Sequence, residues 1–152
     1  MFRYPDLKDI VEKNTDKVKE LGRFLWEHAE VGNREFRCSA ELVHRYRKEG
    51  FEVARGVGFF PTSFIARWRW REAKPRIGLL SDFDALPHLS LLREGEPGQG
   101  CMHHQYAARA FGTAVVMKEY MERHDVPGEI VVFGAPAEEI GGSKQYFARQ
   151  GL

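Results

Sequence analysis

The sequence has few cysteines and almost no net charge. Two cysteines among 152 residues are too few for a disulfide framework, and they suit a reducing compartment. The formal net charge of +1 gives no electrostatic reason to expect a nucleic acid or an anionic membrane surface as a partner. We therefore predict no nucleic-acid partner and no membrane-surface partner.

Long apolar runs are also missing. The longest ones, such as residues 130–133, fall far short of the roughly 18 residues that a membrane helix needs. Asp6, Lys8 and Asp9 stand where a signal peptide needs an apolar stretch. Together with the few cysteines, this predicts a cytoplasmic protein.

What remains is the composition of a globular domain, with 43% hydrophobic and 30% charged residues. Apolar periodicity and turn residues predict helices over 6–29, 34–49 and 103–123, a short helix with Ser143 as its N-cap, and strands over 51–54, 62–70, 76–81 and 129–135. The alternation in 62–70 is typical of an antiparallel or edge strand, and the apolar run in 76–81 is typical of a buried central strand. Helices alternate with central strands in the second half, which predicts an α/β layered sheet.

The predicted second helix has a face formed by Phe36, Ala40, Val43 and Tyr46. These residues recur at helical spacing, so we expect that face to be buried.

Cys101 and His103 lie between a glycine-rich loop and the predicted helix over 103–123. The dipole and the free N–H groups at a helix N-terminus favour a thiolate, which is the form that binds metal. The alternative is a small buried cysteine beside a histidine that caps the helix.

Acidic pairs follow two of the predicted strands. Glu138 and Glu139 could act as a metal ligand and as a general base, or they could form a solvated acidic loop. One of Asp82 and Asp84 could accept a hydrogen bond from a ligating histidine and so orient its ring, or both could cap the loop. Thiolate, imidazole and carboxylate groups together suit a borderline-soft divalent ion.

Five segments in order resemble the dinuclear metal amidohydrolases of the aminoacylase and carboxypeptidase superfamily, in particular the aminobenzoyl-glutamate and indoleacetyl-amino-acid hydrolase branch. The segments are HAEVGNREFRCSAEL, GVGFFPTSFIARW, IGLLSDFDALP, GEPGQGCMHH and VVFGAPAEEIGGSK. The resemblance implies a zinc-exopeptidase-like sheet flanked by helices.

The resemblance also implies roles for individual residues. Cys101 matches a bridging thiolate ligand, His103 a terminal metal ligand and Glu139 a carboxylate ligand of the second metal ion. Glu138 matches the general base. Asp84 belongs to an element beside the site, and Asp82 lies where many relatives outside this branch have a ligating histidine.

The implied reaction is hydrolysis of an amide bond with two divalent ions, zinc or manganese. The metal pair would lower the pKa of a shared water, Glu138 would take its proton and return it to the leaving amine, and the metal would stabilise the oxyanion. The implied substrate is a small-molecule amide, namely an N-acyl amino acid, an aminobenzoyl-glutamate-like compound or a dipeptide-like compound.

The chain departs from the family pattern around the two central ligands. Gln99 replaces a usual histidine, Met102 a usual glycine and His104 a usual asparagine or aspartate. We interpret His104 as a residue that supports the ligands or contacts substrate. We interpret His28 and His88 as loop or surface residues.

Relatives continue well beyond the length of this chain, with two more ligating histidines and an inserted lid and dimerisation domain. We therefore expect residues 1–152 to be the N-terminal part of a metallo-amidohydrolase catalytic domain that is truncated before the lid domain and inactive alone. The remaining parts are either truncated or supplied by another polypeptide, and the expected assembly is a homo-oligomer or a complex with a complementary polypeptide. The alternative is a non-catalytic remnant or a metal- or partner-binding module of the same fold. Nucleotide binding is disfavoured because the glycine clusters at 56–58 and 98–100 do not complete a dinucleotide-binding or P-loop motif.

Overall fold

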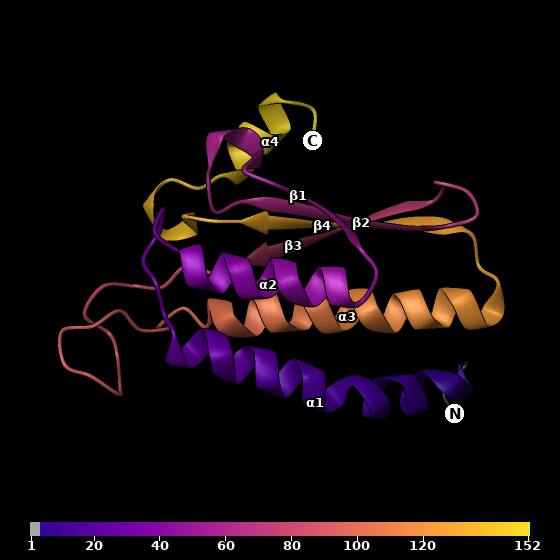
Figure 1. The fold of residues 1–152 in the computed structure, drawn as a ribbon, viewed down its shortest axis with the longest axis horizontal. Helices are drawn as coiled ribbons and strands as arrows, with labels where there is room; N and C mark the ends of the chain where they lie inside the picture. The colour runs from indigo at the N-terminus through magenta and orange to yellow at the C-terminus, as the bar shows by residue number, and fades with distance from the viewer. Residues whose placement is uncertain (1–3) are drawn as a thin grey trace.

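The computed structural model describes residues 4–152 as a four-stranded sheet with helices on both sides (Figure 1). The helices are α1 (Pro5–Glu27), α2 (Phe36–Lys48), α3 (His103–His124) and α4 (Lys144–Arg149), with short 3-10 turns η1 (Val57–Phe59) and η2 (Glu138–Ile140). The strands are β1 (Glu52–Arg55), β2 (Phe64–Trp70), β3 (Arg76–Asp82) and β4 (Gly128–Ala135). The predicted α/β class is confirmed.

The strand order is β1-β2-β4-β3. The pairs β1–β2 and β2–β4 are antiparallel, and β3 runs parallel to β4. Within the described residues β3 has a neighbour on one side only, and Ile77 and Leu80 are largely exposed. The prediction of a central position for this strand was therefore wrong. An apolar run reports that both faces of a strand are suited to burial, and it does not report how many strands flank it.

The core lies between the sheet and the helices α2 and α3, and α1 packs on α3 (Figure 1). On β2, Phe64 and Ala66 are fully buried, and Trp68 and Trp70 continue the same row, as the alternation predicted. The antiparallel pairing of β2 is confirmed, but β2 is an inner strand.

The buried face of α2 differs from the prediction. Phe36 and Ala40 are exposed, whereas Cys38, Ser39 and Leu42 are buried beside Val43 and Tyr46. The first turn of the helix buries the small residues Cys38 and Ser39, and Ser39 Oγ donates a hydrogen bond to the Thr62 carbonyl at 2.6 Å. A large aromatic residue at the helix start therefore does not mark the core.

Ser143 precedes α4 as predicted, but its side chain does not cap the helix. Its hydroxyl donates instead to the Pro136 carbonyl at 2.9 Å and closes the turn after β4. No helix among residues 4–152 is both long and apolar enough to cross a membrane.

Candidate metal centre

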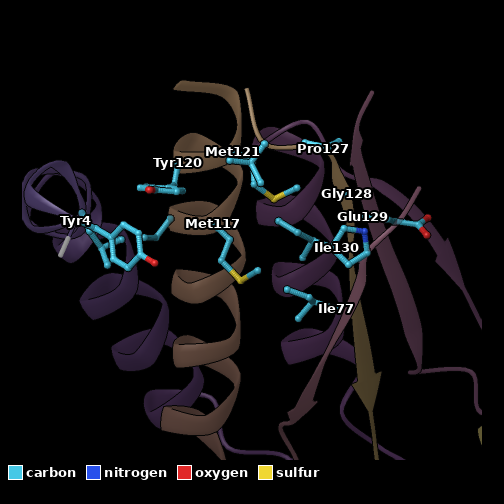
Figure 2. Close-up of a pocket in the computed structure, with 13 residues that line it drawn as sticks. Tyr4, Ile77, Met117, Tyr120, Met121, Pro127, Gly128, Glu129 and Ile130 are labelled. Carbon is cyan, nitrogen blue, oxygen red and sulfur yellow. The ribbon is translucent and has the colours of Figure 1, made fainter. Parts of the chain in front are cut away.

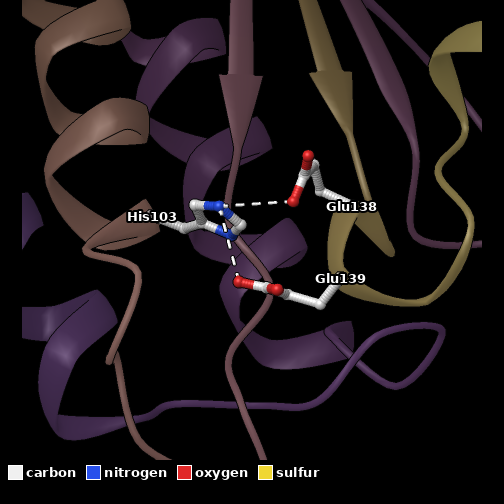
Figure 3. A group of neighbouring side chains, drawn as sticks. All are labelled: His103, Glu138 and Glu139. Carbon is white, nitrogen blue, oxygen red and sulfur yellow. Dashed lines mark ion pairs between the residues drawn. The ribbon is translucent and has the colours of Figure 1, made fainter.

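The carboxyl ends of β3 and β4 lie side by side, because these strands are parallel and Asp82 is paired in register with Ala135. The chain after β3 carries Asp84, and the turn η2 after β4 carries Glu138 and Glu139. The N-terminus of α3 begins at His103 at the same end of the sheet, so three separate segments converge there (Figures 1 and 3).

The ring of His103 is held in one orientation by Asp84. Nδ1 of His103 lies 2.9 Å from Oδ1 of Asp84 and 3.1 Å from the Asp84 carbonyl oxygen. Both partners are acceptors, so Nδ1 carries the proton and Nε2 is directed away from Asp84. A carboxylate behind a histidine in this way fixes the tautomer that a metal ion needs.

Nε2 of His103 faces the two glutamates of η2. It lies 3.7 Å from Oε2 of Glu138 and 3.8 Å from Oε1 of Glu139 (Figure 3). One ligand atom from each of the three side chains falls within 4.8 Å of the others. The Glu139 side chain is mostly buried, at 18% exposure, whereas that of Glu138 is 40% exposed and more open to solvent.

Asp84 also supports the glutamate turn. Its second oxygen, Oδ2, accepts a hydrogen bond from the backbone N–H of Glu139 at 3.0 Å. The side chain is fully buried. One carboxylate therefore holds both His103 and Glu139, and the sequence prediction that Asp84 lies beside the site agrees with its position.

The local charges favour a cation. The hydrogen bond to Asp84 raises the pKa of His103, and the nearby carboxylates add to the effect. The pKa of Cys101 is also raised, first by the interaction of its thiol with Glu139 and then by the surrounding negative charge. For the protein without bound metal, this direction is opposite to the expectation that the helix N-terminus favours the thiolate, because the neighbouring carboxylates disfavour a further negative charge.

These donors fit a divalent ion such as zinc or manganese. Oε1 of Glu139 is buried without a hydrogen-bond partner among the described residues, and a cation would satisfy it. Borderline divalent ions accept imidazole nitrogens and carboxylate oxygens as ligands, and the Cys101 thiol lies near Glu139. Cys101 is exposed and lies outside the group of His103, Glu138 and Glu139, although it is close to Glu139.

The loop between β3 and α3 is folded back so that Cys101 reaches the site. Leu86 and Gly98 exchange two backbone hydrogen bonds, of 3.0 and 2.9 Å. Gly98 has no room for a side chain there, because a Cβ would collide with the Leu89 carbonyl. Cys101 follows three residues after this pairing.

Asp82 does not contact His103. Its Oδ2 lies 2.9 Å from Nζ of Lys144, and the same Nζ lies 4.0 Å from Oε1 of Glu138. Asp82 therefore reaches the site through a lysine and through its charge, which helps to raise the pKa of His103. Sequence reasoning missed Lys144, although it directly follows the predicted cap Ser143.

The three residues that depart from the family pattern occupy different local environments. Oε1 of Gln99 accepts the backbone N–H of His104 at 3.0 Å and so caps α3. Met102 adopts a left-handed φ of 63°, which glycine adopts more easily than any side-chain-bearing residue. The pKa of His104 is lowered by burial, and its ring is outside the group of neighbouring ligand atoms.

An apolar cavity of about 460 Å³ lies at the other end of the strands, against the C-terminal half of α3 (Figure 2). It is bordered by Ile77, Met117 and Met121, with Glu129 at its rim. It brings together no group of metal-binding or nucleophilic side chains among the described residues, so the candidate chemistry stays at the carboxyl ends of the strands.

The chain is similar in sequence to known hydrolases. It is 31% identical to one subunit of the p-aminobenzoyl-glutamate hydrolase from Escherichia coli, over 100% of this chain and 33% of that protein. It is 28% identical to the human Xaa-Arg dipeptidase, over 90% of this chain and 33% of that protein. No family model matches the chain. The chain thus spans about a third of the length of these curated relatives.

Its fold also matches solved structures. A dinuclear metal-binding peptidase of the M20 family from Bacillus subtilis superposes with a TM-score of 0.78 at 24% identity, over 92% of this chain and 40% of that one. At this identity the match supports the fold alone. The resemblance to aminobenzoyl-glutamate hydrolase and its relatives is confirmed by the sequence comparisons.

Proposed function

Because the chain is homologous to these hydrolases and dipeptidases, we propose that it supplies part of the active site of a metal-dependent amidohydrolase. The proposed reaction is hydrolysis of the amide bond of an N-acyl amino acid, an aminobenzoyl-glutamate-like compound or a dipeptide-like compound. The observation that carries this proposal is the position of His103, whose free Nε2 faces Glu138 and Glu139 while Asp84 holds the opposite nitrogen.

In the proposed site, Cys101, His103 and Glu139 hold the divalent ions, which are zinc or manganese. A bound pair of such ions supplies Lewis acidity, which polarises the amide carbonyl and acidifies water. Glu139 suits the ligand role because its buried oxygen lacks a hydrogen-bond partner among the described residues.

Glu138 suits the role of general base. It is the more exposed carboxylate of the pair, so a water and a substrate amide can reach it. It would take a proton from the attacking water and return it to the leaving amine. The ammonium group of Lys144, 4.0 Å away, helps to keep this carboxylate in place. Asp82 in turn holds Lys144.

Residues 1–152 correspond, in this proposal, to the N-terminal part of a metallo-amidohydrolase catalytic domain. The aminobenzoyl-glutamate relative is named as a subunit and is about three times as long as the segment it shares with this chain. Further ligands would come from the part of such an enzyme that residues 1–152 do not span. A reducing, cytoplasmic compartment suits the two free cysteines, one of which is a proposed ligand.

The experiment is an amide-hydrolysis assay on the complete enzyme, loaded with zinc or manganese, with aminobenzoyl-glutamate and N-acetyl amino acids as substrates. Glu138→Gln should lower kcat by about 100-fold or more, as expected for loss of a general base, while metal affinity changes little. Glu139→Gln should weaken metal binding as well as activity. Full activity in Glu138→Gln would show that another residue is the base. Metal binding without hydrolysis of any substrate would favour a binding module of the same fold.

A further inference from the structure

Glu35 is a buried carboxylate beside the turn that follows β4, and it makes no hydrogen bond or ion pair with the proposed ligands. It ends the connection between α1 and α2 and is 0% exposed. That connection lies at the same end of the molecule as the carboxyl ends of β3 and β4 (Figure 1). Although Glu35 stands at the N-cap position of α2, its side chain makes no capping bond to that helix.

The carboxylate instead joins two distant segments. Oε1 of Glu35 accepts the backbone N–H of Ala137 at 2.8 Å, and Oε2 accepts the hydroxyl of Thr62 at 2.9 Å. Ala137 is 102 residues away in the sequence and directly precedes Glu138. The bond therefore reaches the base of the turn that carries both proposed functional glutamates.

Ala137 needs such a partner. It is 2% exposed and adopts a left-handed φ of 60°, a conformation that is unfavourable for a residue with a side chain. Without Glu35 its N–H would be left without an acceptor in a buried position, which is unfavourable. The turn would then relax, and the carboxylates of Glu138 and Glu139 would move with it.

The rest of the connection between α1 and α2 also contacts the segments that carry the proposed site residues. Gly32 lies against Ile140 and the Cα of Ala137, closely enough that a Cβ would collide with the Ile140 side chain. The carbonyl of Glu30 accepts the N–H of Ala85, which directly follows Asp84, at 2.8 Å. One connection thus supports both strand-end segments whose side chains meet at His103.

We infer that Glu35 is a positioning residue of the metal centre, which fixes the turn after β4 so that Glu138 and Glu139 face His103. This inference rests on the proposed function for its metal readout, and it also has a readout that needs no metal. The N–H of Glu139 donates to Asp84 Oδ2, so the hydrogen exchange of that amide reports whether the turn is in place.

The test compares Glu35→Ala with two other variants by zinc calorimetry and by amide hydrogen exchange. Glu35→Gln is the conservative variant, because its amide oxygen can still accept from Ala137 while its NH2 group faces the Thr62 hydroxyl. Glu30→Ala is the matched control on the same connection. The Glu30 carboxylate accepts the N–H groups of Arg37 and Cys38 and so supports α2, with no side-chain contact to the turn.

We expect Glu35→Ala to weaken zinc binding by about tenfold or more, the loss typical of residues that orient ligands, and to accelerate exchange at Ala137 and Glu139. Glu35→Gln should restore most of the affinity, and Glu30→Ala should keep wild-type affinity even where its stability falls. Wild-type zinc affinity and unchanged exchange in folded Glu35→Ala would overturn the inference, as would an equal loss of affinity in Glu30→Ala.

Two further outcomes remain decisive. If Glu35→Ala does not fold, Glu35→Asp replaces it, because a side chain shorter by one methylene cannot reach both Ala137 and Thr62. Faster exchange at Ala137 and weaker zinc binding in Glu35→Asp support the inference, and wild-type values overturn it. If the wild-type chain binds no zinc, the proposed function fails, and the exchange of the Glu139 amide alone decides the role of Glu35.

Discussion

Oδ1 of Asp84 accepts a hydrogen bond from Nδ1 of His103 at 2.9 Å. The orientation leaves Nε2 as the free nitrogen, and Nε2 is the atom that faces the glutamates of η2. Because Asp84 also accepts the N–H of Glu139, its two oxygens set the distance between an imidazole and a carboxylate that come from different segments. The arrangement prepares a site for a cation before any cation is bound.

Asp84→Asn should weaken zinc binding by about 10–100-fold. An asparagine can accept from only one of the two donors, because its NH2 group would face either His103 or the N–H of Glu139. Calorimetric titration measures the effect. Asp82→Asn is the control, since Asp82 contacts Lys144 rather than His103 and should lose less affinity. Equal losses in the two variants would contradict the role assigned to Asp84.

The two thiols should differ in reactivity. Cys38 is fully buried, its Sγ donates to the His28 carbonyl at 3.1 Å, and burial raises its pKa strongly. Cys101 is exposed. Iodoacetamide should therefore modify Cys101 alone in the folded protein and both cysteines in urea, as counted by mass spectrometry.

Zinc should slow the modification of Cys101 if that thiol is a ligand. The Cys101→Ala variant provides the control, since it should show no modification in the folded state. Labelling of Cys101 at the same rate with and without saturating zinc would exclude it from the metal centre.

The stability of the protein should depend on pH through Glu35. Burial raises the pKa of this carboxyl group above its ordinary value of 4.5. The folded protein therefore keeps the proton at pH values where the unfolded chain has released it, so the associated stability is lost as the pH rises from 4.5 through the folded-state pKa.

Relative to Glu35→Gln, the wild-type free energy of unfolding should fall in that window, by up to about 1.4 kcal/mol per pH unit. Urea unfolding at a series of pH values measures the difference. A difference that rises with pH, or that stays constant, would mean that Glu35 is not held as a protonated group by its surroundings.

Gly98→Ala should disturb the loop that brings Cys101 to the site. The added Cβ would collide with the Leu89 carbonyl, and overpacking of this kind costs about 1–3 kcal/mol. Both the melting temperature and the zinc affinity should fall. Gly22→Ala is the matched control. Gly22 lies within α1, and its added Cβ would meet the Cβ of Ala108 in α3 at an ordinary contact distance of 3.5 Å. The substitution should stabilise α1 by about 0.5–1 kcal/mol, because alanine loses less conformational freedom in a helix than glycine.

Much of the fold could be predicted from the sequence, because periodicity reports which residues lie on one face. The alternation from Phe64 to Trp70 predicted the buried row of β2, and the helix predicted over 103–123 corresponds to α3. The edge position of β3 could not be predicted from its apolar run, since strand order depends on contacts between segments far apart in the sequence. The face of α2 was predicted wrongly because Phe36 is exposed at the helix start.

The sequence placed Glu138 and Glu139 after one predicted strand and Asp84 after another, and the structure brings these segments together at His103. The roles of these residues, and the place of Asp84 beside the site, were implied by the resemblance to the amidohydrolases. Lys144 and Glu35 were not foreseen. Their partners, Asp82 and Ala137, lie 62 and 102 residues away, and no local pattern records such contacts.

The most direct test of the account is a calorimetric titration of zinc and manganese into the 152-residue chain, with His103→Ala measured in parallel. We predict that the wild-type chain binds at least one of the two ions and that His103→Ala binds it at least about tenfold more weakly, because an imidazole ligand is lost. Identical binding by the two proteins, or no binding by the wild type, would contradict the claim that these residues form a metal centre.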